Sequence, residues 1–324
     1  MNTIGNNFRV SIFGESHGKL VGVTIDGCPA GIPLQEADLL HDLERRKAGA
    51  NGTTPRTESD IPTFVSGTFN GYTTGAPITI VFENNNIRSA DYSAIRNTPR
   101  PGHADFVLTN KHKGYNDYRG GGHSSGRLTV ALVTAGVVAK KILGKINISA
   151  SLIEAGGQTD IEAAIALAIA QQDSIGGIVS CIVANLPVGL GEPFFNSVES
   201  VISHVVFSVP AVKGIEFGAG FGAARMTGSM HNDMIINEEG TTATNNAGGI
   251  NGGISNGNDI TFRVAIKPTS STPQTQQTWN NDTKKVAQFV VKGRHDLCIA
   301  LRVPVVIEAA TAIALADLQL SCAR

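Results

Sequence analysis

The sequence has little charge and no excess of either sign. Only 16% of its 324 residues are charged, and 26 basic residues nearly cancel 27 acidic ones. No global electrostatic field therefore favours a polyanion, which argues against a protein that binds nucleic acid or an anionic membrane surface. Any site for an anion must be local.

Cysteine is sparse and membrane signals are missing. Cys28, Cys181, Cys298 and Cys322 show neither a C-x-x-C pair nor a ligand-like spacing to histidine, so we expect reduced core thiols and no metal site. The start MNTIGNNFRVSIFG lacks the basic and apolar regions of a signal peptide, and we find no 18-residue apolar stretch. These absences predict a soluble, cytoplasmic protein.

The chain also lacks a linker rich in proline, serine or charge, and it shows no internal repeat, which predicts a single domain over residues 1–324. Hydrophobic periodicity predicts strands in pairs with helices between the pairs. This order favours an α+β fold with largely antiparallel sheets. The predicted strands are 8–13, 20–25, 63–69, 77–82, 146–153, 177–184 and 260–266, and the predicted helices are 36–46, 128–143, 161–171, 198–209 and 304–320.

Glycine, in contrast, is abundant, with 37 residues. Two glycine-rich tracts, 84–127 and 214–258, show little periodicity and carry arginine, histidine and asparagine. Loops of this length are usually functional or disordered. Their polar side chains favour ordered ligand loops over disordered arms.

The stretch GESHG at 14–18 matches the G-x-S-x-G pattern of a hydrolase nucleophile elbow, with Ser16 at its centre. An elbow needs a strand-to-helix turn, whereas this stretch is predicted to join two strands. A serine hydrolase that uses Ser16 therefore stays only as an alternative. We favour Ser16 as a hydrogen-bond donor and His17 as a proton donor.

Histidines and arginines recur together in short glycine-flanked stretches. His17, His103 and His295 lie in GESHG, RPGHAD and GRHD, and Arg100, Arg119, Arg127 and Arg294 lie in or beside such loops. Arginine binds phosphate or carboxylate with a planar fork of donors, so we predict one folded anion site. The alternative is a set of solvated surface side chains.

The stretch RGGGHSSGR at 119–127 leads directly into a predicted helix. Ser124 or Ser125 can cap that helix while free backbone N–H groups face an anion. No Walker or dinucleotide-binding glycine pattern occurs, which argues against an ATPase loop or a Rossmann site. KPTSS at 267–271 adds one ammonium and three hydroxyl groups.

Taken in order, these motifs resemble those of the chorismate synthase family over nearly the whole chain. The resemblance is carried by FRVSIFGESHG, DGCPAGIPL, ERRKAG, RSADYSAI, RPGHADF, DYRGGGHSSGR, QDSIGGIV, LPVGLGEPFF, SVPAVKGIEFGAGF, NNAGGINGGIS, IKPTSS and GRHDLC. It implies a sandwich of antiparallel β-sheets with a central helical layer, and a homotetramer. It also implies a lyase that eliminates phosphate and a C6 hydrogen from 5-enolpyruvylshikimate 3-phosphate in a 1,4-anti sense. The product is chorismate, in the shikimate pathway of aromatic amino acid biosynthesis. Reduced FMN (FMNH2) is required without net redox change.

The resemblance also implies the roles of individual residues. His17 protonates the departing phosphate, His103 stabilises the reduced flavin, and Asp296 helps to remove the C6 proton through flavin N5. The residues implied in substrate binding are Ser16, Arg46, Arg100, Arg127 and Arg294. Those implied in flavin binding are His123, Ser124, Ser125, Pro210, Ala211, Gly252, Lys267, Pro268, Thr269, Ser270, Ser271 and Arg294. Some members of the family use the Arg46 position for NADP, which makes NADPH a candidate external or internal reductant.

Three positions depart from the family pattern. His123 replaces an arginine and Leu128 a glutamate in GGGHSSGRLT, and Gly52 stands near a position where another arginine is usual. Histidine loses its charge near neutral pH whereas arginine keeps it, so FMN affinity is expected to be weaker or more sensitive to pH. The resulting alternative is a homologue that binds flavin or phosphate with impaired turnover.

Overall fold

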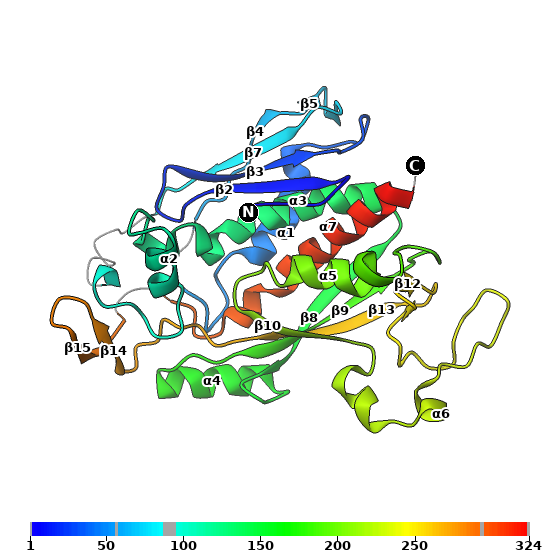
Figure 1. The fold of residues 1–324 in the computed structure, drawn as a ribbon. Coiled ribbons are helices and arrows are strands. Elements are labelled where there is room, and N and C mark those ends of the chain that lie inside the picture. The colour runs from blue at the N-terminus through cyan, green and yellow to red at the C-terminus, as the bar shows by residue number, and fades with distance from the viewer. Residues whose placement is uncertain (1, 56–57, 87–94, 292–294, 323–324) are drawn as a thin grey trace.

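Two antiparallel sheets enclose a layer of helices in the computed structural model, which describes residues 2–55, 58–86, 95–291 and 295–322 (Figure 1). The first sheet has the strand order β1-β2-β3-β7-β4 and the second the order β10-β13-β9-β8. The first consists of β1 (Thr3–Ile4), β2 (Arg9–Gly14), β3 (Leu20–Asp26), β7 (Ile78–Glu83) and β4 (Thr63–Ser66). The second consists of β10 (Val212–Phe217), β13 (Ile260–Ile266), β9 (Gly177–Ala184) and β8 (Asn147–Ala155).

Helices α1 (Glu36–Arg46), α3 (Thr129–Leu143), α5 (Val198–Val206) and α7 (Pro304–Cys322) lie between the sheets, and α4 (Ile161–Gln171) covers the outer face of the second sheet (Figure 1). This arrangement confirms the predicted sandwich with a central helical layer. Short helices α2 (Asp105–Lys111) and α6 (Gly228–His231) lie in the two glycine-rich tracts. Three small hairpins complete the strands: β5 (Thr68–Phe69) with β6 (Tyr72–Thr73), β11 (Ile250–Asn251) with β12 (Ile254–Ser255), and β14 (Gln276–Asn280) with β15 (Lys285–Phe289).

The central helices α3 and α7 are apolar on all sides because both are enclosed. Every residue of α3 from Thr129 to Ala139 is buried, as is every residue of α7 from Val305 to Leu318. The two helices approach closely at Gly136, where an added Cβ would lie 2.3 Å from the Cβ of Ala309. A side chain at this glycine would therefore separate the two central helices.

Helix α7 also corrects a prediction from the sequence. It is long and apolar enough to cross a membrane by length and composition, with a mean hydropathy of 1.6, so an 18-residue apolar stretch does exist. Because 78% of that stretch is buried inside the protein, α7 is a core helix here. Two acidic residues within α7, Glu308 and Asp317, are buried and hydrogen-bonded.

Several element predictions were wrong in detail. Helix α2 was missed inside the 84–127 tract, and β10 and the β14–β15 hairpin were not predicted. The strand predicted over 63–69 is divided between β4 and β5, and the helix predicted over 198–209 ends at Val206. Cys28, Cys181 and Cys298 are buried free thiols as expected, but Cys322 is exposed.

Candidate active site

A cavity of about 1360 Å³ runs between the helical layer and the glycine-rich loops. Segments that are far apart in the sequence line it, and among them are 46–48, 102–104, 123–129, 209–213 and 267–271, together with Thr54, Glu58, Asp60, Arg100, Gly120, Asp296 and Arg302. Its volume exceeds the range of about 300–1,000 Å³ that is usual for a site holding one small molecule. The cavity can therefore hold two ligands side by side.

Most of the predicted site residues line this cavity. They are Arg46, Arg100, His103, His123, Ser124, Ser125, Arg127, Pro210, Ala211, Lys267, Pro268, Thr269, Ser270, Ser271 and Asp296. Gly252 lies apart from the cavity, in the turn between β11 and β12. Arg294 lies outside the described residues. Arg119, which the anion-site prediction included, instead pairs with Asp117 at 2.7 Å and does not line the cavity.

Ser16 and His17 are buried directly behind the glycine triplet 120–122. The GESHG turn connects β2 to β3, which is the predicted strand-to-strand setting and not the setting of a nucleophile elbow. All three glycines have positive φ, and an added Cβ at Gly120 would lie 2.6 Å from His17 Cδ2 and 2.9 Å from Ser16 Oγ. Glycine is therefore required at this position for the cavity wall to approach His17 so closely.

The two glycine loops are locked together by backbone contacts. The Ser16 amide donates to the carbonyl of Gly122 at 3.1 Å, and His123 Nδ1 lies 2.8 Å from the carbonyl of Gly14. Since only a protonated Nδ1 can donate to a carbonyl, this contact sets the orientation and tautomer of the His123 ring. Ser125 caps the 3-10 turn Gly126–Leu128 that precedes α3, as the sequence predicted for Ser124 or Ser125.

His103 is held by a buried carboxylate on the first turn of α2. Its Nδ1 lies 2.7 Å from Asp105 Oδ1, and Asp105 also accepts two hydrogen bonds at 2.8 Å from Arg100. Burial raises the pKa of Asp105, but hydrogen bonds from Arg100 and His103 outweigh it and hold this pKa well below its usual range. Asp105 is therefore ionised and orients both neighbours.

The KPTSS stretch closes the same side of the cavity. Ser271 Oγ accepts a hydrogen bond from Arg100 at 2.9 Å, and Lys267 Nζ donates to the carbonyl of Gly102 at 3.0 Å. Burial, with the nearby charge of Lys213, lowers the pKa of Lys267. The hydroxyl of Thr269 is buried and makes no hydrogen bond within the described residues. This stretch thus offers a cation and a free hydroxyl to a ligand.

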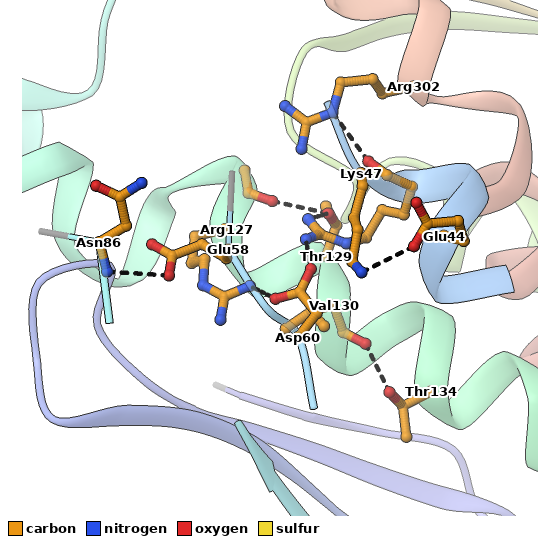
Figure 2. A network of polar contacts seen from close by, with 12 residues as sticks. Glu44, Lys47, Glu58, Asp60, Asn86, Arg127, Thr129, Val130, Thr134 and Arg302 are labelled. Carbon is orange, nitrogen blue, oxygen red and sulfur yellow. Dashed lines mark hydrogen bonds and ion pairs between the residues drawn. The ribbon is translucent and has the colours of Figure 1, made fainter. Parts of the chain in front are cut away.

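Arg46 and Arg127 meet at one carboxylate on the cavity wall. Asp60 forms ion pairs with both guanidinium groups, one through each of its oxygens. The Arg127 Nε donates to Asn84 Oδ1 at 3.0 Å, and Arg46 lies 3.3 Å from the hydroxyl of Thr129. Figure 2 shows the Asp60 carboxylate directed at Arg127, with Glu58 on the other side of that arginine.

Asp296 is far from the glycine triplet in the sequence, yet it lines the same cavity as Gly120. Its Oδ1 accepts from the Thr54 amide at 2.9 Å, and Arg302 lies 3.2 Å from its Oδ2. Arg302 in turn donates to the carbonyl of Arg46 at 2.9 Å (Figure 2). The end of α1 and the acidic Asp296 are therefore held in one network.

Comparison with known proteins agrees with this geometry. A family profile for chorismate synthase matches residues 8–320. The chain belongs to the chorismate synthase family. The chorismate synthase of Chitinophaga pinensis is 65% identical over 321 residues, which cover 99% of this chain and 97% of that protein. The chorismate synthase of Methanocaldococcus jannaschii is 42% identical over 365 residues, with coverages of 99% and 96%.

A solved structure supports the same assignment. A crystal structure of a chorismate synthase matches this fold with a TM-score of 0.76 at 26% identity, and the match covers 98% of this chain and 93% of that one. The chain is thus a lyase of the shikimate pathway, as its resemblance implied.

The three departures from the chorismate synthase pattern take distinct places. His123 lines the cavity, so the lost arginine charge is lost at the site itself. Leu128 is only 3% exposed, and it packs in the core and also lines the cavity. Gly52 accepts hydrogen bonds through its carbonyl from the amides of Leu297 and Cys298, at 2.9 and 3.1 Å. It thereby holds the loop that follows Asp296.

Sequence analysis missed the residues that position the predicted ones. Asp60, Asp105 and Arg302 contact predicted site residues, yet none was singled out. Asp105 stands inside RPGHAD, so its closeness to His103 was an available signal. Asp60 and Arg302 carry no signal in the sequence, because they reach their partners only through the fold.

Proposed function

We propose that this chain catalyses the 1,4-anti elimination of phosphate from 5-enolpyruvylshikimate 3-phosphate to give chorismate, with reduced FMN as cofactor. The observation that carries the proposal is the convergence of His103, Asp296 and three buried arginines on one cavity, with His17 just behind its wall. The substrate bears a phosphate and two carboxylates. A cavity with several cations but few apolar aromatic side chains suits such an anion.

The residues present fit reduced FMN. The cavity volume leaves room for a flavin beside the substrate, and the buried, unpartnered hydroxyl of Thr269 offers a hydrogen bond to a polar ligand. Lys267, Ser270 and the backbone around the glycine triplet can hold a phosphate or a polar ring edge. When bound, reduced FMN supplies electron density to the substrate as phosphate leaves and recovers it afterwards.

His17 is the proposed proton donor to the departing phosphate. The residue is 4% exposed, and its ring packs against Gly120, which lines the cavity. Protonation by His17 would make the phosphate a better leaving group. The burial of His17 keeps bulk water away from the transferred proton. Ser16, fully buried beside it, is proposed to bind substrate and not to act as a nucleophile.

His103 is proposed to stabilise the reduced cofactor through its second ring nitrogen. Since Asp105 is ionised and 2.7 Å from Nδ1, the proton on Nδ1 points to Asp105. The ring thus presents Nε2 on the side of Gly121, where an added Cβ would lie 3.6 Å from this atom. The Asp105 contact fixes which nitrogen faces the ligand.

Asp296 is the proposed group that takes up the proton lost from C6. Arg302 and the Thr54 amide hold its carboxylate in place, and it lines the cavity. Arg46, Arg100 and Arg127 are proposed to bind the phosphate and carboxylates of the substrate. Each is at most 7% exposed, so water competes little with the ligand for its donors.

Anaerobic turnover tests the proposal. Purified protein is mixed with photoreduced FMN and 5-enolpyruvylshikimate 3-phosphate, and both phosphate and chorismate are measured. His17→Ala should cripple turnover while the fold persists, whereas Ser16→Ala should only impair it. Equal turnover with oxidised FMN would refute the proposed role of the cofactor. Binding of the substrate without formation of phosphate and chorismate would instead support the alternative of a homologue with impaired turnover.

We also infer that the protein works as a cytoplasmic homotetramer and that NADPH is a candidate source of electrons for the flavin. These inferences come from family resemblance. Sedimentation measures the oligomeric state. Loss of oxidised flavin absorbance after NADPH is added to the protein and FMN, compared with FMN alone, tests whether the chain reduces its own cofactor.

A further inference from the structure

Asp60 occupies an unusual position for a buried acid. Its side chain is 0% exposed, and its backbone adopts a φ of +49°, a region that residues other than glycine rarely occupy. The structure around it must favour this conformation, since the left-handed region is unfavourable for a residue with a side chain. Such backbone strain clusters at functional sites, and Asp60 lines the cavity of the proposed active site.

Asp60 pairs with more than one cation. Its one carboxylate pairs with both Arg46 and Arg127, whose side chains are each only 4% exposed. Burial lowers the pKa of each arginine, and the attraction of Asp60 opposes that effect. Arginine stays protonated in proteins, so these three groups together carry a positive charge, and the carboxylate of Glu58 on the same cavity wall also attracts both arginines.

The trio also retains an unused donor. The Nε of Arg46 is buried and makes no hydrogen bond within the described residues. A buried donor without a partner is costly, and in a cavity wall it indicates a place for a ligand. This free donor on a cationic group favours an anionic ligand.

We propose that Asp60 is a positioning residue that holds Arg46 and Arg127 as one fixed pair for an anionic group of the substrate. This inference rests on the proposed function. Asp60 acts through the arginines and does not itself contact the substrate. Without the shared carboxylate the two guanidinium groups would lose the ion pairs that hold them together and would repel each other.

The proposal and a simple charge effect predict opposite changes in the affinity of the cavity for an anion when Asp60 is replaced. Asp60→Asn makes the cavity more positive, so long-range attraction alone would tighten the binding of an anion. If Asp60 positions the arginines, the same substitution should weaken binding. A purely structural role would lower the active fraction, and therefore kcat, while KM stayed unchanged.

The test compares Asp60→Asn with Asp26→Asn, a matched control. Asp26 forms a surface ion pair with Arg9 away from the cavity, so the control changes net charge equally without touching the site. Circular dichroism first establishes that each variant is folded. We then measure KM and kcat with reduced FMN, and the affinity for inorganic phosphate by calorimetry.

For Asp60→Asn we expect KM for the substrate to rise and phosphate affinity to fall, each by roughly tenfold or more, because charged hydrogen bonds lose their geometry. The control should match the wild type in both. Unchanged or tighter phosphate binding by folded Asp60→Asn would overturn the proposal. So would a wild-type protein that binds neither phosphate nor substrate.

A second variant covers the case in which Asp60→Asn does not fold. Thr129→Val removes the other side-chain contact of Arg46 and leaves Asp60 in place. It should raise KM and weaken phosphate binding in the same direction by a smaller factor, and no change in either would overturn the proposal. Phosphate binding does not depend on turnover, so an inactive wild type that still binds phosphate through Asp60 refutes the proposed function alone.

Discussion

The contact between Asp105 and His103 gives the sharpest test of the site. Asp105→Asn keeps the shape of the side chain but removes its charge. The amide can then present an NH2 group to His103 Nδ1, which lies 2.7 Å from the present carboxylate oxygen. A donor facing a donor favours the other tautomer of the ring, with its proton on Nε2.

The magnitude follows from the kind of bond that is lost. A hydrogen bond to a charged group contributes about 1.5–3 kcal/mol, and about 1.4 kcal/mol corresponds to a tenfold change in rate, so kcat should fall roughly 10- to 150-fold. Arg100 also loses its two-bond ion pair but keeps the hydroxyl of Ser271. The breaking of this buried pair should lower the free energy of unfolding by about 3–5 kcal/mol.

The assay is anaerobic turnover with photoreduced FMN, performed at a temperature where melting curves show the variant to be folded. Asp282→Asn is the control, because Asp282 is exposed and contacts only Asn97 and its own turn in the described structure. A folded Asp105→Asn protein with wild-type kcat would refute the orienting role of Asp105. An equal loss of kcat in the Asp282→Asn control would show that the loss does not come from the contact between Asp105 and His103.

Three further predictions concern packing and charge. Gly120→Ala should abolish turnover while the fold persists, because its Cβ would lie 2.6 Å from His17; kcat is the measurement. Gly136→Ala should lower Tm although alanine favours helices, because the added methyl group overpacks against Ala309, which should lower the free energy of unfolding by about 1–3 kcal/mol. Glu308→Gln should lower the free energy of unfolding near neutral pH by about 3 kcal/mol, measured by denaturant titration.

Each of these predictions has a control or a refuting result. Gly222→Ala and Gly228→Ala add a methyl group in open space and should leave activity and Tm unchanged. For Glu308, burial raises the pKa but Arg45 and Lys140 lower it overall, below its usual value of 4.5. Its stabilisation is therefore present above pH 4.5 and is lost as the pH falls through the lowered folded pKa. Equal acid sensitivity of the wild type and Glu308→Gln would contradict this reasoning.

Local patterns predicted much of the fold. Helices α1 and α4 and strands β9 and β13 have the predicted bounds, because their hydrophobic periodicity and end signals are clear. Helix α2 was missed because it is short, and its only buried residue is Asp105. The β14–β15 hairpin was missed because it is polar and lies at the edge of the molecule (Figure 1).

From the sequence alone, periodicity predicted antiparallel sheets, and the resemblance of its motifs implied the family and the sandwich, since motifs and periodicity depend on residues that are close together in the chain. The sequence could not determine which acids hold the ligand loops, because an ion pair such as that of Asp60 with Arg127 joins residues 67 positions apart. Only the tertiary structure brings one buried carboxylate between two arginines and one glycine against His17. The strength of ion pairs and hydrogen bonds depends on distances through space, and only the packed chain sets these distances.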